Sequence, residues 1–479
     1  MPAPKGPAPK GPAPKSPEPK NPEPRGPEPK SWERHLMGRI ADQVETIKEE
    51  FKNQLNLTIM GVPDGQGGVA YMYVEGQVLV QDKYLEEVFA VFNPGVKFNH
   101  EQIERVVPGV SLLTQDPKIP AKNRRSVHDT LTTIDHQLGE GVATPNHLFT
   151  VCPVGPCPAT EPEEVYYDCE PYPSLCLEGG GAGVLVYVAD TGLLQNSAVD
   201  HPWLQGVTRA TVPTGALQDW DPAGVTLTGT NTIPPYAGHG TFVAGLIRAM
   251  APQADVIVSN VFKVAGSCLE KDMVKELDQA LDLGVDVFNL SITATTRHDL
   301  SSLGFDGFLR RLHQHQGVVC VVAAGNNGSR KPCWPAASPG MVSVGALSAD
   351  WRGRATFSNY GHWVRVYAPG RDLVNAYASG PYECQDAPYA GQVRNFYGMC
   401  KWSGTSFSTP IVTGLVAARM SRTGETGQEA AAALLEEARA HAIPGVGPVL
   451  LPRCGPCHEP ADCSCRPRCH PTEPCAHDR

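Results

Sequence analysis

The chain lacks several features that would assign it to common classes of protein. No segment approaches the roughly 18 consecutive apolar residues of a membrane-spanning helix, and the N-terminus lacks the apolar core of a secretory signal. The formal net charge is -10 and no long basic stretch lies in the folded part, so the footprint of a nucleic-acid-binding protein is missing. We therefore expect no transmembrane segment and no nucleic-acid partner. The compartment stays open between the cytoplasm and export by another route.

Charged residues are also few, at 19%, whereas apolar residues make up 41% of the 479 residues. This balance predicts an ordered core, with room for one large domain and smaller ones. The 48 glycines and 45 prolines exceed average usage and indicate long loops or tails. Fifteen cysteines are more typical of an oxidising compartment than of the cytosol.

Residues 1–31 are dominated by six Pro-rich pentapeptides, from PAPKG to PEPKS. Alternating prolines remove backbone donors and fix φ, which favours extended polyproline II and cannot bury a core. We interpret this segment as a disordered spacer. The alternative is a docking sequence for a proline-recognising partner or a cell-surface polymer.

Residues 32–145 predict a small α+β domain, because a helical pattern is followed by alternating strands and a second helix. The predicted elements are a helix through Val44, Ile47 and Phe51, a hairpin of residues 71–74 and 77–80 turning at Glu75-Gly76, and a helix over residues 84–92.

A Cys- and Pro-rich connector over residues 146–180 precedes the largest predicted domain, residues 181–450. In that domain, mostly apolar runs over residues 184–189, 256–258, 285–290 and 318–323 are separated by possible helices. Such alternation predicts a mostly parallel sheet with helices on both faces, a doubly wound α/β fold.

Three residues of this domain have the chemistry of an activated nucleophile: Asp190 in VADTG, His239 in GHGTFVAG and Ser406 in GTSFSTP. A serine hydroxyl attacks an amide at neutral pH only when an imidazole accepts its proton and a carboxylate holds the imidazole tautomer. Asp190 falls where an apolar strand ends, while His239 and Ser406 precede helical runs. Asp-Thr-Gly also occurs in aspartic proteases, but that chemistry needs a second such aspartate, and the chain has no second Asp-Thr-Gly.

Over residues 181–420 these blocks resemble the signature blocks of the subtilisin-like serine proteases, the subtilases. The resemblance implies a serine endopeptidase that hydrolyses peptide or protein substrates through an acyl-enzyme on Ser406. It also implies that Asn326, in AAGNNG, donates to the oxyanion together with the Ser406 backbone N–H. The chain departs from the family at Phe407-Ser408, where relatives commonly have Met-Ala.

Two further segments resemble those that line the primary specificity pocket of subtilases. They are Ser291-Ile292-Thr293 and Ala323-Ala324-Gly325. Relatives usually have Gly at the position of Thr293, so we expect the added bulk to narrow the pocket or shift the substrate. The same analogy suggests that residues 32–145 are a propeptide, with a permanent accessory domain as the equal alternative. We expect no cofactor and no catalytic metal, and no acidic cluster here has calcium-loop spacing.

Residues 451–479 form a Cys-rich tail that is either stapled by disulfides or bound to zinc. Its Cys454–His458 string also fits a haem-attachment pattern that recurs by chance. Nine cysteines remain elsewhere, of which Cys320 lies in an apolar strand and is expected to be a buried thiol, leaving eight that could pair.

Two other functions share the same residues. An esterase could use the same triad, and a binding protein could retain the protease scaffold without catalysis.

Overall fold

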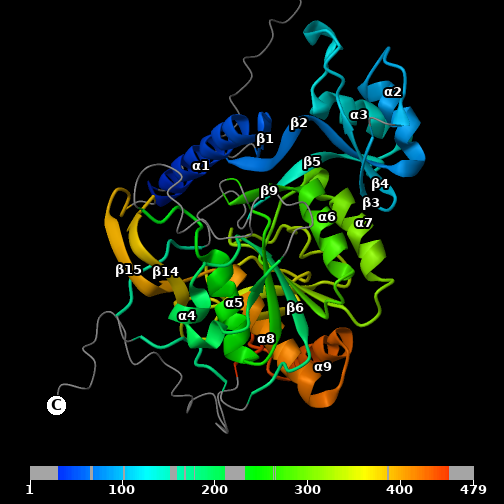
Figure 1. Ribbon diagram of the computed structural model, residues 1–479. Coiled ribbons are helices and arrows are strands. Elements are labelled where there is room, and N and C mark those ends of the chain that lie inside the picture. Colours follow the sequence, from blue (N-terminus) through cyan, green and yellow to red (C-terminus); the bar gives the residue numbers. More distant parts are fainter. Residues whose placement is uncertain are drawn as a thin grey trace, which may run out of the picture.

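The computed structural model describes residues 31–64, 68–100, 103–150, 159–166, 169–176, 179–210, 232–262, 264, 266–385 and 388–452. The predicted Pro-rich segment lies outside these ranges except for Ser31, and the Cys-rich tail does so from residue 453 on. The described chain forms a large parallel sheet flanked by helices, with a smaller antiparallel sheet at one end (Figure 1).

The large sheet has seven strands in the order β13-β12-β11-β10-β6-β8-β7, and its strand pairings are parallel. The four apolar runs predicted as buried strands each form one of these strands, which confirms the prediction. The strands are β6 Leu185–Asp190, β7 Thr208–Arg209, β8 Asp255–Asn260, β10 Val287–Leu290, β11 Val319–Ala323, β12 Val342–Leu347 and β13 Val366–Pro369.

Helices cover both faces of this sheet, so the predicted doubly wound α/β fold is confirmed. Along β6, Val186 and Val188 point into one core and Tyr187 and Ala189 into the other, as the period of two in a strand requires. The first core contains α5 His239–Met250, α8 Thr405–Thr423 and α9 Gly427–Ala440, and the second contains α6 Glu270–Leu281 and α7 Leu303–Leu312.

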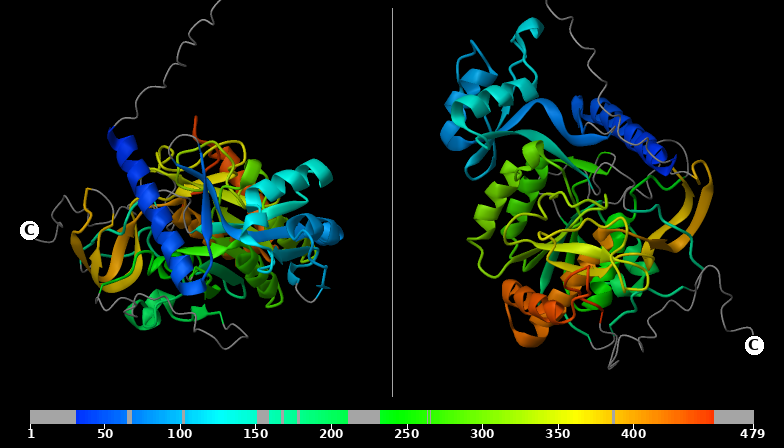
Figure 2. Two further views of the ribbon diagram at one scale, coloured as in Figure 1. Left: turned by 90° about the horizontal axis from the view of Figure 1, so that it is seen from above. Right: turned by 180° about the vertical axis from the view of Figure 1, so that it is seen from behind.

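The smaller sheet belongs mainly to the N-terminal part of the chain, which packs against α6 and α7 (Figures 1 and 2). The predicted first helix is confirmed, because Val44, Ile47 and Phe51 are all buried on α1. The strand order is β3-β4-β2-β5-β9, with β1 on β2. The elements are α1 Ser31–Leu55, β1 Ile59–Pro63, β2 Val69–Gln81, α2 Leu85–Phe92, β3 Glu104–Val107, β4 Val110–Thr114, α3 Val127–Leu138, β5 Ala143–Thr150 and β9 Ser267–Leu269.

The hairpin predicted at Glu75-Gly76 is wrong, since residues 69–81 form the single strand β2. A two-residue type I′ hairpin turn needs positive φ at both central residues, but only Gly76 of the pair has it, at 78°. The register of β2 against β5 instead shifts between Tyr73 and Val78. Gly76 therefore makes an irregularity within the strand, and β2 exchanges β1 for β4 as its neighbour across it.

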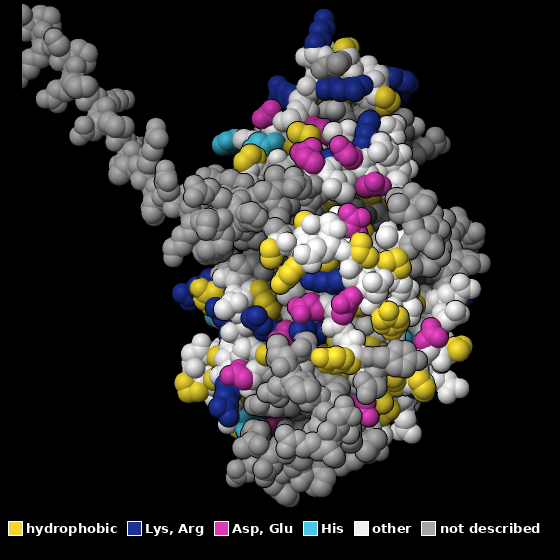
Figure 3. Space-filling view, turned by 90° about the vertical axis from the view of Figure 1, so that its left-hand side faces the viewer, with side chains coloured by type: hydrophobic (Ala, Val, Ile, Leu, Met, Phe, Trp, Pro, Cys, Tyr) yellow, Lys and Arg dark blue, Asp and Glu magenta, His cyan; other side chains and the backbone are white. Residues whose placement is uncertain are grey.

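A long hairpin of β14 Leu373–Glu383 and β15 Val393–Trp402 projects beside the main sheet (Figure 1). The connector lies along both of its edges, because Glu163 pairs with Lys401 of β15 and Tyr172 pairs with Val374 of β14. Figure 3 looks onto this side of the molecule, where hydrophobic, acidic and basic side chains are intermixed. The connector thus covers hydrogen-bonding edges that would otherwise be open to other strands.

The described cysteines that carry free thiols include the buried Cys320. The prediction for Cys320 is confirmed, and Cys176, Cys268, Cys333 and Cys400 are free as well. These four therefore do not form the disulfides that were open to them.

The remaining elements are short: α4 Ser197–Asp200 and the 3-10 turns Asp82–Tyr84, Ala121–Asn123, Pro202–Leu204 and Arg297–Asp299.

Helix α5 approaches the loop after β6 so closely that backbone meets backbone. The N–H of Gly240 donates to Thr191 Oγ1 at 3.0 Å. A Cβ at position 240 would lie only 2.3 Å from the carbonyl oxygen of Gly192. Glycine is therefore required here by space, and it fixes how near α5 lies to the end of β6.

We expect Gly240→Ala to lower the free energy of unfolding by about 1–3 kcal/mol, because α5 must shift away from Gly192. Denaturant unfolding followed by circular dichroism measures this change. Gly353→Ala is the matched control, since a Cβ there would meet only Ser348 Oγ at 3.6 Å. Equal stabilities of the two variants would contradict the steric argument.

Candidate active site

Asp190 and His239 form a buried hydrogen-bonded pair. Asp190 is the last residue of β6 and His239 the first of α5, and both side chains have 0% exposure. Asp190 Oδ1 lies 2.6 Å from His239 Nδ1 and also accepts the N–H of Thr191 at 2.8 Å. Because an ionised carboxylate can only accept, the pair places the imidazole proton on Nδ1. His239 Nε2 is buried and makes no hydrogen bond to the described residues.

Ser406 lies in the first turn of α8, which begins at Thr405. Four residues on, Pro410 has no N–H and so gives the Ser406 carbonyl no helical hydrogen bond. The hydroxyl of Ser291 donates to that carbonyl instead, at 3.0 Å. The side chain of Ser291 therefore supports the start of α8, and the substrate contact expected of this residue from the sequence stays a prediction.

The support for Ser406 continues into the core through a line of buried hydrogen bonds. Asn289 Nδ2 donates to Ser291 Oγ at 3.1 Å, and Thr413 Oγ1 donates to Asn289 Oδ1 at 2.9 Å. These bonds join the end of β10 to two points of α8 that lie about two turns apart. A satisfied buried network of this kind limits the movement of the groups it connects.

Asn326 is held against the same helix start. Its Oδ1 accepts the backbone N–H of Thr405 at 2.8 Å and the Thr405 hydroxyl at 2.9 Å. Because a backbone N–H can only donate, the amide oxygen faces Thr405 and the Nδ2 group is turned the other way. Asn327, the neighbour most easily confused with it, instead contacts Asn359 with its side chain at 3.4 Å.

The two predicted pocket segments come together beside this site. Thr293 Cγ2 lies 3.5 Å from the point where a Cβ on Gly325 would be, and Gly325 has a positive φ of 101°. The Gly325 N–H donates to Thr405 Oγ1 at 3.0 Å, which ties the segment to α8. Ile292, Ala323 and Ala324 are buried, and of these Ile292 and Ala324 pack into the second core.

The N-terminal part of the chain reaches this pocket through β5. The backbone groups of Thr150 and Thr293 exchange hydrogen bonds of 3.4 and 3.3 Å. On the other side of residues 151–158, which are not described, the N–H of Ala159 donates to the carbonyl of Ser403 at 3.0 Å. The chain is therefore held by Thr293 just before residues 151–158. Just after them it is held by Ser403, which lies three residues before Ser406.

An aromatic cluster encloses His239. The imidazole centroid lies 5.1 Å from the Phe407 ring and 5.6 Å from the Trp402 ring, and Phe242 packs behind both. Trp402 was not identified from the sequence, although an aromatic residue four positions before Ser406 was a visible signal. Thr405 was likewise seen only as part of a motif, not as the partner of Asn326.

A buried thiol lies next to the pocket loop but does not compete as a nucleophile. Asn359 Nδ2 donates to Cys333 Sγ at 3.2 Å and to the Ala324 carbonyl at 2.9 Å. Burial raises the pKa of the Cys333 thiol to about 12. The thiol is therefore protonated at neutral pH and only weakly nucleophilic.

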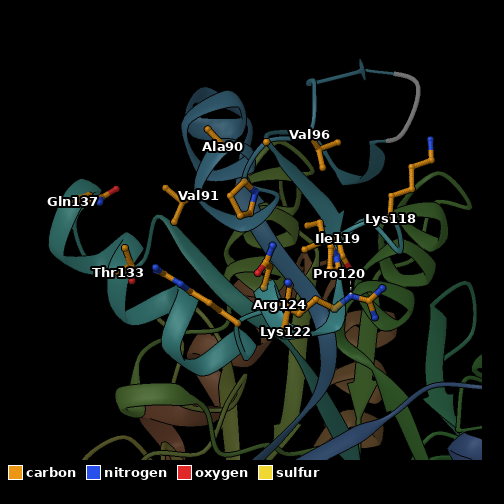
Figure 4. Close-up of a pocket in the computed structure, with 14 residues that line it drawn as sticks. Ala90, Val91, Val96, Lys118, Ile119, Pro120, Lys122, Arg124, Thr133 and Gln137 are labelled. Atoms are coloured by element: carbon orange, nitrogen blue, oxygen red, sulfur yellow. Dashed lines mark hydrogen bonds between the residues drawn. The ribbon is translucent and has the colours of Figure 1, made fainter.

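A cavity of about 900 Å³ lies away from this site, in the N-terminal part of the chain (Figure 4). All of its lining residues fall between Ala90 and Gln137, and four of them are basic: Lys118, Lys122, Arg124 and Arg125. None of them belongs to the candidate site, so this cavity is not the catalytic cleft.

The described residues contain no group of three or more His, Cys, Asp or Glu side chains placed to hold a metal ion. Among the helices in the described ranges, none combines the length and apolar character needed to cross a membrane.

The sequence is similar to known proteins of one family. The model of the Subtilase family matches residues 181–448. The chain is 27% identical over 372 residues to a thermophilic serine proteinase of Bacillus sp. (strain AK1), covering 72% of this chain and 78% of that protein. It is 31% identical over 258 residues to subtilisin-like protease 2 of Arthroderma otae, covering half of each. The chain therefore spans about half the length of that fungal relative.

The fold is also found among solved structures. Fervidolysin from Fervidobacterium pennivorans, a keratinolytic enzyme related to subtilisin, superposes with a TM-score of 0.51 over 80% of this chain and 60% of its own, at 20% identity. At this identity the likeness concerns the fold alone. Because the family match covers more than half of the sequence, the chain belongs to the subtilase family and is a serine endopeptidase.

Proposed function

We propose that this chain hydrolyses peptide bonds through an acyl-enzyme on Ser406, with His239 as general base and Asp190 as the orienting acid. The observation that carries the proposal is the buried 2.6 Å contact between Asp190 Oδ1 and His239 Nδ1. With its proton on Nδ1, the imidazole has its lone pair on Nε2, the atom that must accept the proton of Ser406. The same nitrogen then returns the proton to the leaving amine.

We also assign the oxyanion donors to Asn326 Nδ2 and the backbone N–H of Ser406. The support is the orientation of the Asn326 amide, whose oxygen is bound twice by Thr405. A donor held in place before the reaction needs no reorganisation as negative charge develops on the substrate oxygen. In subtilisin itself, loss of the corresponding asparagine costs about 2.7–4 kcal/mol of transition-state stabilisation.

The substrate is a peptide or protein segment, which we propose binds in extended form beside Thr293. The support is Thr150, which already pairs with Thr293 through backbone hydrogen bonds. Substrate and β5 would therefore use the same hydrogen-bonding groups. The side chain of Thr293 lies beside Gly325, and its bulk would restrict the residue accepted next to the cut bond.

The triad assignment predicts that Ser406→Ala abolishes both peptide hydrolysis and labelling by a fluorophosphonate probe. Ser408→Ala is the matched control, because Ser408 lies on the same helix and its buried Oγ makes no hydrogen bond to the described residues. We expect this control to keep wild-type labelling. Peptide hydrolysis that persists in Ser406→Ala would refute the assignment.

Thr405 should act through Asn326, because its hydroxyl donates to Asn326 and accepts from Gly325. We expect Thr405→Val to lower kcat about tenfold or more with little change in KM, since a misplaced oxyanion donor acts mainly on the transition state. Thr405→Ser restores the hydroxyl and should recover most of the rate. Equal kcat values for the two variants would show that the hydroxyl does not matter.

We further propose that the N-terminal α+β domain is a propeptide that blocks the site until it is removed. Strand β5 supports this, because it pairs with β9 and ends on Thr293. Two further contacts join the same surfaces: a buried hydrogen bond of 2.7 Å between His147 Nδ1 and Glu270 Oε2, and an ion pair of 2.6 Å between Asp135 and Arg297. A cut that frees this domain and keeps the connector from Ala159 on would fall between Thr150 and Ala159.

The propeptide proposal predicts that the active protein begins between residues 151 and 159, measured as intact mass and N-terminal sequence. It also predicts that Asp135→Asn speeds activation of the full chain, because Arg297, at 7% exposure, loses its partner. Asp129→Asn, exposed on the same helix, serves as the control. A fully active protein that retains residues 31–150 would identify the domain as a permanent accessory.

A further inference from the structure

We infer that Trp402 is a positioning residue for the catalytic histidine, and that the connector holds the indole in place. The inference rests on the proposed role of His239 as general base. It assigns to the connector, which lies outside the residues matched by the family model, a part in aligning the triad.

The first observation is how the imidazole is held. Among the described residues its one hydrogen bond, to Asp190, fixes Nδ1 but leaves the ring able to pivot about that contact. The planes of the Trp402 and His239 rings stand at 82° with centroids 5.6 Å apart, and Phe407 packs against His239 at 5.1 Å. Edge-to-face contacts of this kind have a preferred geometry. The two rings therefore restrict the pivot and with it the direction of Nε2.

The second observation is how the indole is held. Trp402 is 2% exposed, and its Nε1–H donates to the carbonyl of Thr160 at 2.7 Å. On either side of this bond, Ala159 pairs with Ser403 and Glu163 pairs with Lys401. The Glu163 carboxylate also lies 2.8 Å from the Lys401 ammonium. The connector thus forms a short ladder on β15 with the indole hydrogen bond at its centre.

These contacts form one continuous path from the connector to the reacting nitrogen. The Thr160 carbonyl fixes the orientation of the indole through its hydrogen bond. The indole in turn packs against the imidazole, and Asp190 binds the imidazole at Nδ1. Trp402 also contacts Phe242 and Tyr377, so a purely structural role in the core is the competing explanation. The two roles differ in what they predict for kcat and for the state of the imidazole.

The test compares Trp402→Phe, which keeps an aromatic ring but loses the Nε1–H, with Trp402→Leu, which loses both. A displacement of a reacting group by about 1 Å can cost about 100-fold in rate. We expect kcat to fall roughly tenfold in the Phe variant and further in the Leu variant, with KM within about twofold. The pH dependence of kcat/KM should shift in both variants.

The matched control is Trp351→Phe, because the Trp351 Nε1–H makes no hydrogen bond to the described residues and its ring stacks on Tyr172 instead. This control should keep the wild-type kcat and pH profile. Thermal unfolding of all variants separates a general loss of stability from misalignment. A parallel fall in unfolding temperature and rate across all three variants would overturn the inference in favour of core packing.

A second readout does not require turnover. The Nδ1–H proton of His239, shared with Asp190, is followed by proton NMR in the full-length protein over a pH titration. We expect its resonance and its titration midpoint to move in Trp402→Phe and not in Trp351→Phe. If kcat, pH profile and resonance are unchanged in Trp402→Phe but altered in Trp402→Leu, the role of the connector is refuted. Peptide hydrolysis by Ser406→Ala would instead refute the proposed function on which the inference rests.

Discussion

The hydrogen bond between Asp190 and His239 is the constraint on which the rest of the structure depends. It joins the end of a central strand to the start of a helix on one face of the sheet, so the two elements must lie close enough for Asp190 Oδ1 and His239 Nδ1 to be 2.6 Å apart. That approach is permitted by bare backbone at Gly240, where any Cβ would collide with Gly192. It is also buried, with neither side chain exposed, so the pair acts in a low-dielectric environment where its electrostatic effect is larger than in water. Gly240 is thus a condition of the contact rather than a sign of flexibility.

The start of α8 is positioned by a second set of buried polar contacts that depends on one missing hydrogen bond. Pro410 leaves the Ser406 carbonyl without its helical donor, and Ser291 supplies a donor in its place. Through Asn289 and Thr413 the same contacts return to α8 about two turns further on. Asn326 holds the other side of the helix start through Thr405. Ser406 is therefore fixed by groups from two neighbouring strand ends, and this explains how a first-turn residue can be held rigidly without a tight cap of its own.

The sequence allowed prediction of the features that depend on local pattern, and it missed those that depend on distant contacts. Buried strands, the helical face of α1 and the motifs around Asp190, His239 and Ser406 are each legible within a few residues. Trp402 meets Thr160 across 242 positions, and Thr405 meets Asn326 across 79, so neither contact leaves a local signal. The hydroxyl of Ser291 donates to the Ser406 carbonyl across 115 positions, a contact that the match of its segment to the family did not indicate. The predicted hairpin at Gly76 was wrong because a local turn signal was present but did not decide the structure. The pairing of β2 with strands on both sides outweighed it.

By composition the connector is one segment, but in the structure its two ends belong to different parts of the molecule. Its beginning, up to Thr150, is a strand of the N-terminal sheet, whereas from Ala159 on it pairs with the hairpin of the peptidase domain. Backbone hydrogen bonds hold the chain on both sides of residues 151–158, to β9 before them and to β15 after them. If that stretch were cut, the connector residues paired with β15 would stay with the enzyme, and β5 would separate from β9 and leave with the N-terminal domain. The Thr293 backbone would then be vacated by Thr150 while the contact between Thr160 and Trp402 was kept. The same event would thus open the substrate groove and leave the alignment of His239 undisturbed, because the two functions depend on opposite ends of one connector.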